Sequence, residues 1–166
     1  MAKKIIILGG DSVEQNVAEN VSTWSYNANT DVGPIFPDQN ITYTLSGADA
    51  QYFNIDKNTG VVTLKVAADY EVKSSYDVVI TATHVSGGKD TQELQIEVQN
   101  VNDNAPDIQI AAQVAIDENT AAVTTATATD ADGTLNPLTY SHGGADAALF
   151  NIDSATGKLS FKSEPA

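Results

Sequence analysis

The chain has 166 residues, among them 22 acidic residues, eight lysines and no arginine, and its formal net charge is −14. This balance makes nucleic acid and anionic membrane poor partners, because both repel an acidic surface. The absence of cysteine excludes disulfide bonds and cysteine-ligated metals. Hard cations with oxygen ligands are the counterpart that the composition favours.

Alternation of apolar and polar residues predicts strands over most of the chain. In residues 76–82, alternate positions from Tyr76 to Ala82 are apolar, and Leu94, Ile96 and Val98 follow the same pattern in 91–98. Gly, Asn and Asp turns separate such stretches, and no segment has the 3.6-residue period of an amphipathic helix. We therefore predict an all-β sandwich. The seven strands expected in the first hundred residues lie near 5–18, 22–29, 41–45, 52–55, 61–66, 76–83 and 91–98.

The second part of the chain repeats the first. Residues 42–65 align without gaps on 139–162, with 13 of 24 positions identical. Upstream, Glu19-Asn20 matches Glu118-Asn119, and Asp31 matches Asp130. A repeat of this length is the size of a domain.

The repeat predicts the domain organisation. We expect a complete repeat over 1–101, a linker over 102–106 and a partial repeat over 107–166. The second copy has counterparts of the first five strands but no equivalent of 69–98, so we expect it to be a truncated repeat in a fragment of a longer array. Its third strand, near 138–141, therefore lacks its usual neighbour, and we expect it to be frayed or paired with another chain.

Short acidic motifs lie where the two copies meet and at the ends of their strands. The sequence NVNDNAP at residues 100–106 combines oxygen-bearing side chains with turn formers. The other motifs are Ala18-Glu19-Asn20, Asp69-Tyr70-Glu71 and Asp130-Ala131-Asp132. Each alone is typical of an ordinary acidic turn, loop or linker.

In this order the motifs resemble tandem cadherin repeats, of the cadherin-like kind found in bacterial surface proteins. The resemblance covers nearly the whole chain. It implies tandem Greek-key β-sandwiches of an immunoglobulin-like type, with calcium bound between successive repeats. It also implies an extracellular or cell-surface location, with any export signal outside these residues and no direct membrane insertion of this segment.

The resemblance also implies which residues bind calcium. The expected ligands are Glu19, Asp69, Glu71 and Asp103 for a first ion; Glu19, Glu71, Asp103, Asp132 and the Val101 carbonyl for a second; and Asn102, the Asn104 carbonyl, Asp130, Asp132 and a carbonyl near Asn136 for a third. Asn100 stands where the family more often has an aspartate, so it offers an amide oxygen without charge. The third site lacks an aspartate that the family takes from the sixth strand of the following repeat.

The implied function is a calcium-dependent adhesion module, with calcium stiffening the junction between repeats. Identical repeats, other surface proteins or polysaccharide are the candidate partners. A calcium-dependent polysaccharide-binding module would need exposed aromatic residues from the set Trp24, Tyr26, Tyr43, Tyr52 and Phe53. A passive surface spacer is the other alternative. We expect no enzyme, because neither histidine, His84 or His142, has a recognisable nucleophilic partner.

Overall fold

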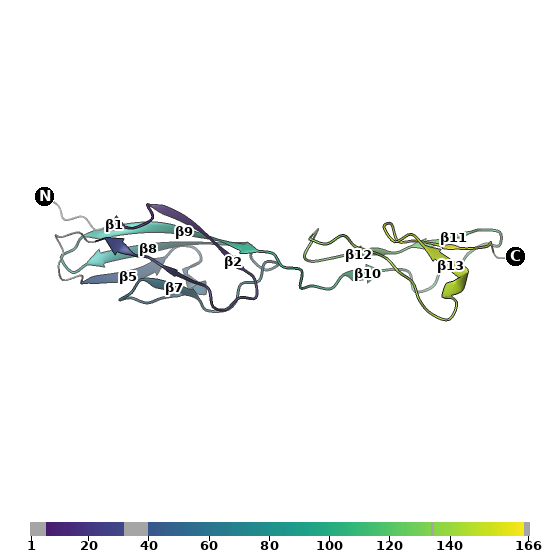
Figure 1. The fold of residues 1–166 in the computed structure, drawn as a ribbon, viewed down its shortest axis with the longest axis horizontal. Coiled ribbons are helices and arrows are strands. Elements are labelled where there is room, and N and C mark those ends of the chain that lie inside the picture. Colours follow the sequence, from purple (N-terminus) through teal and green to yellow (C-terminus); the bar gives the residue numbers. More distant parts are fainter. Residues whose placement is uncertain (1–5, 32–39, 134, 165–166) are drawn as a thin grey trace. The chain divides into compact units, whose positions relative to one another are not determined.

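The computed structural model describes residues 6–31, 40–133 and 135–164. The chain divides into two compact units, the first ending at Val101 and the second beginning at Asn102. Figure 1 labels their strands along the chain. Each unit is described by itself.

The first unit contains two main sheets. One has four strands in the order β2-β9-β8-β5, with β2 parallel to β9 and the other pairs antiparallel; the second has three strands in the order β3-β7-β6. Strands β1 and β4 form a further two-stranded sheet. The strands are β1 (Ile6–Ile7), β2 (Ser12–Ala18), β3 (Ser25–Asn27), β4 (Thr30–Asp31), β5 (Ile41–Ser46), β6 (Phe53–Ile55), β7 (Val61–Leu64), β8 (Ser75–His84) and β9 (Lys89–Gln99), and a 3-10 turn, η2 (Ala50–Tyr52), precedes β6.

The core of the first unit lies between these two main sheets. Alternate residues of β8 and β9 are buried, among them Val78, Ile80, Leu94 and Ile96, and they pack in one cluster with residues of β6 and β7 such as Val62. Because successive side chains of a strand point to opposite faces, the alternation of apolar and polar residues gives each sheet one buried face and one solvent-exposed face. The predicted all-β sandwich is confirmed.

The first predicted strand is wrong in its extent. Residues 8–11 interrupt it, so that β1 and β2 are separate strands, and Ile5 lies outside the described residues. Gly9 and Gly10 have φ angles of 108° and 92°, which lie in a region that favours glycine. The strand predicted near 22–29 is likewise shorter, because only Ser25–Asn27 is extended and paired there.

Gln92 fixes this interruption from inside the core. Its side chain is completely buried. It donates to the carbonyls of Leu8 (3.2 Å) and Gly10 (2.9 Å) and accepts from the Tyr26 hydroxyl (2.8 Å). A buried amide is stable only when it is hydrogen-bonded in this way, and the bonds satisfy carbonyls that the break leaves outside the ladder.

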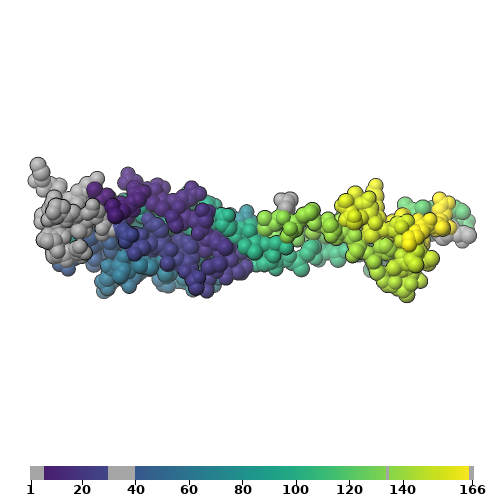
Figure 2. All heavy atoms as spheres, in the orientation of Figure 1, coloured from purple at the N-terminus to yellow at the C-terminus, as the bar shows by residue number. Residues whose placement is uncertain are grey.

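The second unit, green to yellow in Figures 1 and 2, repeats only part of this pattern. Its three-stranded sheet, β11-β14-β13, corresponds to β3-β7-β6, and its two-stranded sheet is β10-β12. The strands are β10 (Asp107–Gln109), β11 (Ala122–Thr125), β12 (Thr127–Thr129), β13 (Phe150–Ile152) and β14 (Lys158–Phe161), with a 3-10 turn η3 (Ala147–Leu149) before β13. Residues 138–141 do not form a strand, so the expected counterpart of β5 is absent as a strand.

A tight turn before β7 recurs residue by residue before β14. Asp56 Oδ1 accepts the N–H groups of Asn58 (2.8 Å) and Thr59 (3.0 Å), and Gly60 has a φ of 73°. In the second unit, Asp153 Oδ1 accepts from Ala155 (3.0 Å) and Thr156 (2.8 Å), and Gly157 has a φ of 70°. Short acidic side chains that bond the backbone two and three residues ahead are typical of such turns.

Candidate metal centre

Glu19 lies directly after β2, where the chain reverses. Asn20 has a φ of 62°, a conformation that asparagine tolerates better than most residues. The Glu19 side chain is 3% exposed. One carboxylate oxygen accepts the N–H of Val101 and the other accepts the N–H of Tyr70 at 2.9 Å. The carboxylate therefore joins the end of β2 to the residue after Asn100 and to the loop before β8.

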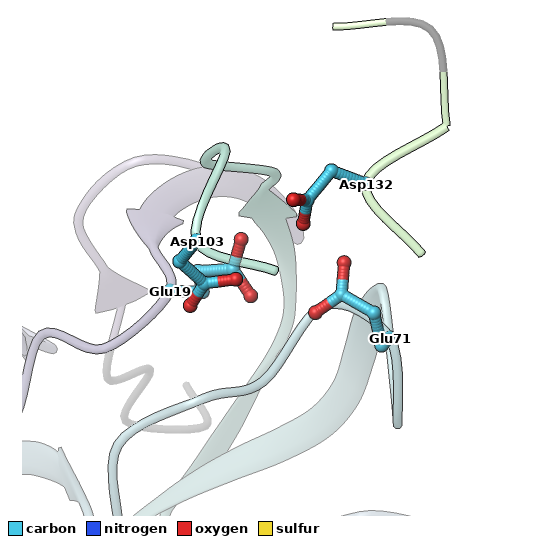
Figure 3. A group of neighbouring side chains, drawn as sticks. All are labelled: Glu19, Glu71, Asp103 and Asp132. Carbon is cyan, nitrogen blue, oxygen red and sulfur yellow. The ribbon is translucent and has the colours of Figure 1, made fainter. Parts of the chain in front are cut away.

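Asp69 shapes the turn that carries Glu71. Asp69 Oδ1 accepts the Val72 N–H (3.0 Å), and its carbonyl accepts the Lys73 N–H (2.9 Å). Glu71 is exposed, and one of its carboxylate oxygens lies within 4.8 Å of one of Glu19. The first unit thus presents a pair of carboxylates, Glu19 and Glu71 (Figure 3).

The second unit presents a pair of its own, Asp103 and Asp132, which Figure 3 also draws. One oxygen of each lies within 4.8 Å of the other. The Asn104 side-chain amide donates to Asp103 Oδ1 (2.8 Å) and to Asp132 Oδ1 (2.9 Å), and the Asn104 backbone N–H donates to Asp132 Oδ2 (2.8 Å). Asp130 supports the pair, because its Oδ1 accepts the Asp132 N–H at 3.0 Å.

These donors change the acidity of Asp132. The Asn104 side-chain amide, followed by the backbone N–H groups of Asn104 and Asp103, lowers the pKa of the Asp132 carboxyl. Hydrogen bonds to the charged form of an acid favour that form. Asp132 is therefore an anion at neutral pH, as a cation ligand must be.

The ten residues expected from the sequence fall into these two groups. Glu19, Asp69, Glu71, Asn100 and Val101 belong to the first unit, and Asn102, Asp103, Asn104, Asp130 and Asp132 belong to the second. Sequence reasoning missed two contributions: the backbone amides that hold Glu19, and the Asn104 side chain between two aspartates. The sequence signal for the Asn104 contribution was an asparagine directly after Asp103. This signal does not show whether the side chain or the backbone carbonyl of Asn104 takes part.

The residues present fit calcium as an ion. The donor set consists of carboxylate oxygens with amide and carbonyl oxygens nearby, and calcium takes six to eight such oxygens. Zinc and copper sites use imidazole or thiolate ligands, whereas the described group contains only Glu and Asp.

Comparison with known proteins identifies the family. A family model described as "Cadherin domain" matches residues 13–99. The chain belongs to the cadherin family. This domain ends at Gln99, directly before the NVNDNAP segment.

Relatives with similar sequences are large cadherins. Protocadherin Fat 2 of Rattus norvegicus is 34% identical over 124 residues, which is 72% of this chain and 3% of that protein. Neural-cadherin of Drosophila melanogaster is 41% identical over 81 residues, covering 45% of this chain and 3% of that protein. The chain thus spans only a small part of the length of these relatives.

Solved cadherin structures have the same fold. The crystal structure of mouse cadherin-23 EC22-24 matches with a TM-score of 0.77 and 24% identity over 97% of this chain and 54% of that chain. Human protocadherin-24 EC1-2 matches with a TM-score of 0.72 and 23% identity over 98% of this chain and 78% of that chain. At these identities the likeness establishes the fold.

Family membership carries general properties. Calcium binding and adhesion are characteristic of cadherin domains, and the family is in general not enzymatic. The relatives are extracellular cell-surface proteins. Among the described residues, no helix has the length and apolar character needed to cross a membrane.

Proposed function

We propose that this chain is a calcium-dependent adhesion module, in which calcium bound between the first cadherin domain and the following repeat makes their junction rigid. The observation that carries the proposal is that each unit presents two neighbouring carboxylates. These are Glu19 and Glu71 in the first unit, and Asp103 and Asp132 in the second. The carboxylates of each pair are close enough to bind one ion together.

The covalent chain supports a shared site. Glu19 accepts the N–H of Val101, and Asp103 follows Val101 by two residues. Two residues span at most about 7 Å. The Cα of Asp103 therefore lies within about 7 Å of the Cα of Val101, and the hydrogen bonds of Asn104 join Asp132 to the same segment of the chain.

Electrostatics supply the mechanism. Carboxylates gathered at short distance repel one another, so without a cation the two pairs separate and the junction is free to bend. A bound divalent ion removes this repulsion and ties ligands of both units together, and its binding free energy favours the ordered junction. The proposed ligands are Glu19, Asp69, Glu71, Asn100, Val101, Asn102, Asp103, Asn104, Asp130 and Asp132.

The arrangement of the aromatic residues favours adhesion over a sugar-binding module. Tyr43 and Phe53 are buried in the core, and Trp24 and Tyr26 are half-buried against it. Tyr52 is 42% exposed but packs edge-on against Tyr76, with ring centroids 5.3 Å apart. A sugar platform needs flat aromatic faces open to solvent, which this set does not offer.

Calorimetric titration with calcium tests the proposed site. We expect the chain to bind two or more ions, and Asp103→Asn to lose most of this binding. Glu93→Gln, which removes an exposed charge in the middle of β9, is the matched control and should bind like the wild type. Absence of binding at millimolar calcium would contradict the calcium site.

A bead-aggregation assay separates adhesion from spacing. Beads coated with the chain should aggregate in calcium and disperse in chelator if identical repeats adhere. Calcium binding without aggregation, and without binding to other surface proteins, would leave the passive spacer as the function.

A further inference from the structure

The loop of residues 69–73 carries two of the proposed calcium ligands, Asp69 and Glu71. Inside the loop, Asp69 Oδ1 accepts the Val72 N–H (3.0 Å), and the Asp69 carbonyl accepts the Lys73 N–H (2.9 Å). These two bonds fix the shape of the turn, but they do not connect it to the sheets. The attachments at the two ends of the loop therefore determine where it presents its carboxylates.

The two ends of the loop are attached in different ways. At the first end, the Tyr70 N–H donates to a carboxylate oxygen of Glu19 (2.9 Å), which belongs to the proposed site itself. At the other end, the Lys73 ammonium lies 3.2 Å from Asp49 Oδ1 and 5.4 Å from the centre of the Tyr76 ring. An ammonium over an aromatic ring is attracted by the face of the ring, so two groups hold this cation.

Both partners of the Lys73 ammonium belong to the folded body of the first unit. Asp49 is buried, and its Oδ2 accepts the N–H of Asp77 in β8 at 2.9 Å. Tyr76, also in β8, is buried and packs edge-on against Phe53, with ring centroids 5.4 Å apart. Lys73 therefore connects the loop to β8 and to the core.

The ion pair also determines where the lysine charge lies. Lys73 is four residues after Asp69 and two after Glu71, so a flexible lysine at this position is close enough in the chain to pair with the carboxylates of the loop. An ammonium beside them would compete with calcium for the same oxygens. The pair with Asp49 draws the ammonium toward the core of the unit instead.

We propose that Lys73 is a positioning residue for calcium binding. Its ion pair with Asp49 holds the end of the 69–73 loop, so that Asp69 and Glu71 are in place before the ion binds. A ligand loop that is already ordered loses less conformational freedom on binding, and its affinity for the ion is higher. This role rests on the proposed calcium function, and Lys73 performs it without contacting the ion.

Lys73→Met tests this role through the sign of its effect. The variant keeps an unbranched side chain beside Tyr76 and removes the charge. By charge alone, loss of a cation from an acidic region strengthens calcium binding. Loss of the anchor weakens it, and we expect the Kd in calorimetric titration to rise roughly three- to fivefold, as for a strong example of a partly exposed ion pair.

Lys65→Met is the matched control for the loss of charge. The Lys65 ammonium donates to the Gln51 carbonyl (2.7 Å), so this variant removes an equal charge without changing a contact of the 69–73 loop. It should bind calcium at least as tightly as the wild type. Weaker binding by Lys73→Met but not by Lys65→Met is therefore the result that supports a positioning role.

Asp49→Asn tests the same pair from its other partner. The variant keeps an oxygen that can accept the Asp77 N–H, but it loses the ion pair with Lys73. We expect it to weaken calcium binding about as much as Lys73→Met. The two changes together should weaken binding no more than the stronger single change, because both remove one interaction. Fully additive losses would contradict a role that acts through this pair.

Amide exchange in chelator gives a second reading that does not require calcium. In Lys73→Met, the amides of Val72 and Lys73 should exchange at least about threefold faster than in the wild type, while those of β8 and β9 keep their protection. Unchanged exchange at these two amides would overturn the proposal. General loss of protection in β8 and β9 would also overturn it, because the pair would then support the fold and not the loop.

The titration separates this role from the calcium function on which it rests. If the wild type binds calcium and Lys73→Met binds it equally well or more tightly, the positioning role is wrong and the calcium site stands. If the wild type itself binds no calcium, the site is wrong and the role of Lys73 is overturned with it.

Discussion

Glu19 is more than a cation ligand, because both of its carboxylate oxygens accept backbone N–H groups, from Val101 and Tyr70. These bonds connect segments that are 82 and 51 residues away in the chain. They satisfy amide groups that lie beyond the ends of the strands, where no ladder partner is available. The residue therefore holds together three segments at the end of the first unit.

Glu19→Gln should destabilise the first unit even without calcium. The variant keeps one acceptor oxygen, but its amide group meets a backbone N–H, and hydrogen bonds to a charged group contribute about 1.5–3 kcal/mol. We expect a loss of about 1–3 kcal/mol in urea unfolding with chelator present. Glu14→Gln, at an exposed position of β2, should change the stability by less than about 0.5 kcal/mol. Equal stability of both variants would show that Glu19 acts only on the cation.

Asp56 should contribute stability that depends on pH. The N–H groups of Asn58 and Thr59 lower the pKa of its carboxyl below the ordinary value. Its stabilisation is therefore fully present above the unfolded pKa of about 3.9 and is lost as pH falls through the lower folded pKa. The urea midpoint of Asp56→Ala should lie below the wild-type midpoint at neutral pH and approach it once the pH is below the folded pKa. A gap that stays constant over this range would contradict the assignment.

At the scale of elements, the two copies of the Asp-to-Gly turn place β7 and β14 against their neighbours. Gly60 and Gly157 both have positive φ angles, and each packs against the aligned tyrosine. A Cβ at Gly60 would lie 2.9 Å from the Tyr43 ring, and one at Gly157 would lie 2.3 Å from the Ala126 carbonyl oxygen. Both turns thus require glycine for conformation and for space.

Gly60→Ala should cost more than an alanine at another left-handed glycine. Gly87 has a φ of 91°, and a Cβ there would meet no atom within 4 Å beyond its chain neighbours, so Gly87→Ala bears only the conformational cost of about 1 kcal/mol. We expect Gly60→Ala to lose at least about 1 kcal/mol more in urea unfolding, because the Tyr43 ring must move. Equal losses would show that the ring yields freely.

The strands that the sequence pattern locates well are those with a strict alternation. β8 and β9 lie where Tyr76, Val78, Leu94 and Ile96 predict them, because each of these side chains faces the core. The break between β1 and β2 could not be located in the same way, because it depends on the side chain of Gln92. This side chain accepts a hydrogen bond from Tyr26, which lies 66 residues earlier in the chain. Long-range polar contacts of this kind leave no periodic signal.

The acidic residues of the site could be expected from their motifs, but not their supports. Glu19, Asp103 and Asp132 could be expected because their motifs resemble those of tandem cadherin repeats. The hydrogen bonds of the Asn104 side chain to both aspartates could not be predicted, because asparagine in a turn has several local hydrogen-bonding patterns. The conformation of Asn20, with its φ of 62° and a match in Asn119 at 61°, shows that the repeat preserves backbone geometry as well as residue type.

At the scale of the whole molecule, the chain combines a first unit that contains the matched cadherin domain with a second unit that repeats its three-stranded sheet. The first unit has its own buried core, so its fold does not depend on the second. The order of the junction has a different source, because acidic residues of both units contribute to the proposed site. Cation binding should therefore change the angle between the units far more than the fold of either.

The distance between the units, measured with and without calcium, tests the proposed role of the cation most directly. The chain has no cysteine, so a spin label can be attached at one introduced cysteine in each unit. Suitable exposed positions are Gln95→Cys in β9 and Gln109→Cys in β10. We predict a broad distribution of distances in chelator, a narrow one in millimolar calcium, and a broad one in calcium when Asp103→Asn is added. Distributions of equal width in all three samples would contradict calcium as the element that makes the junction rigid.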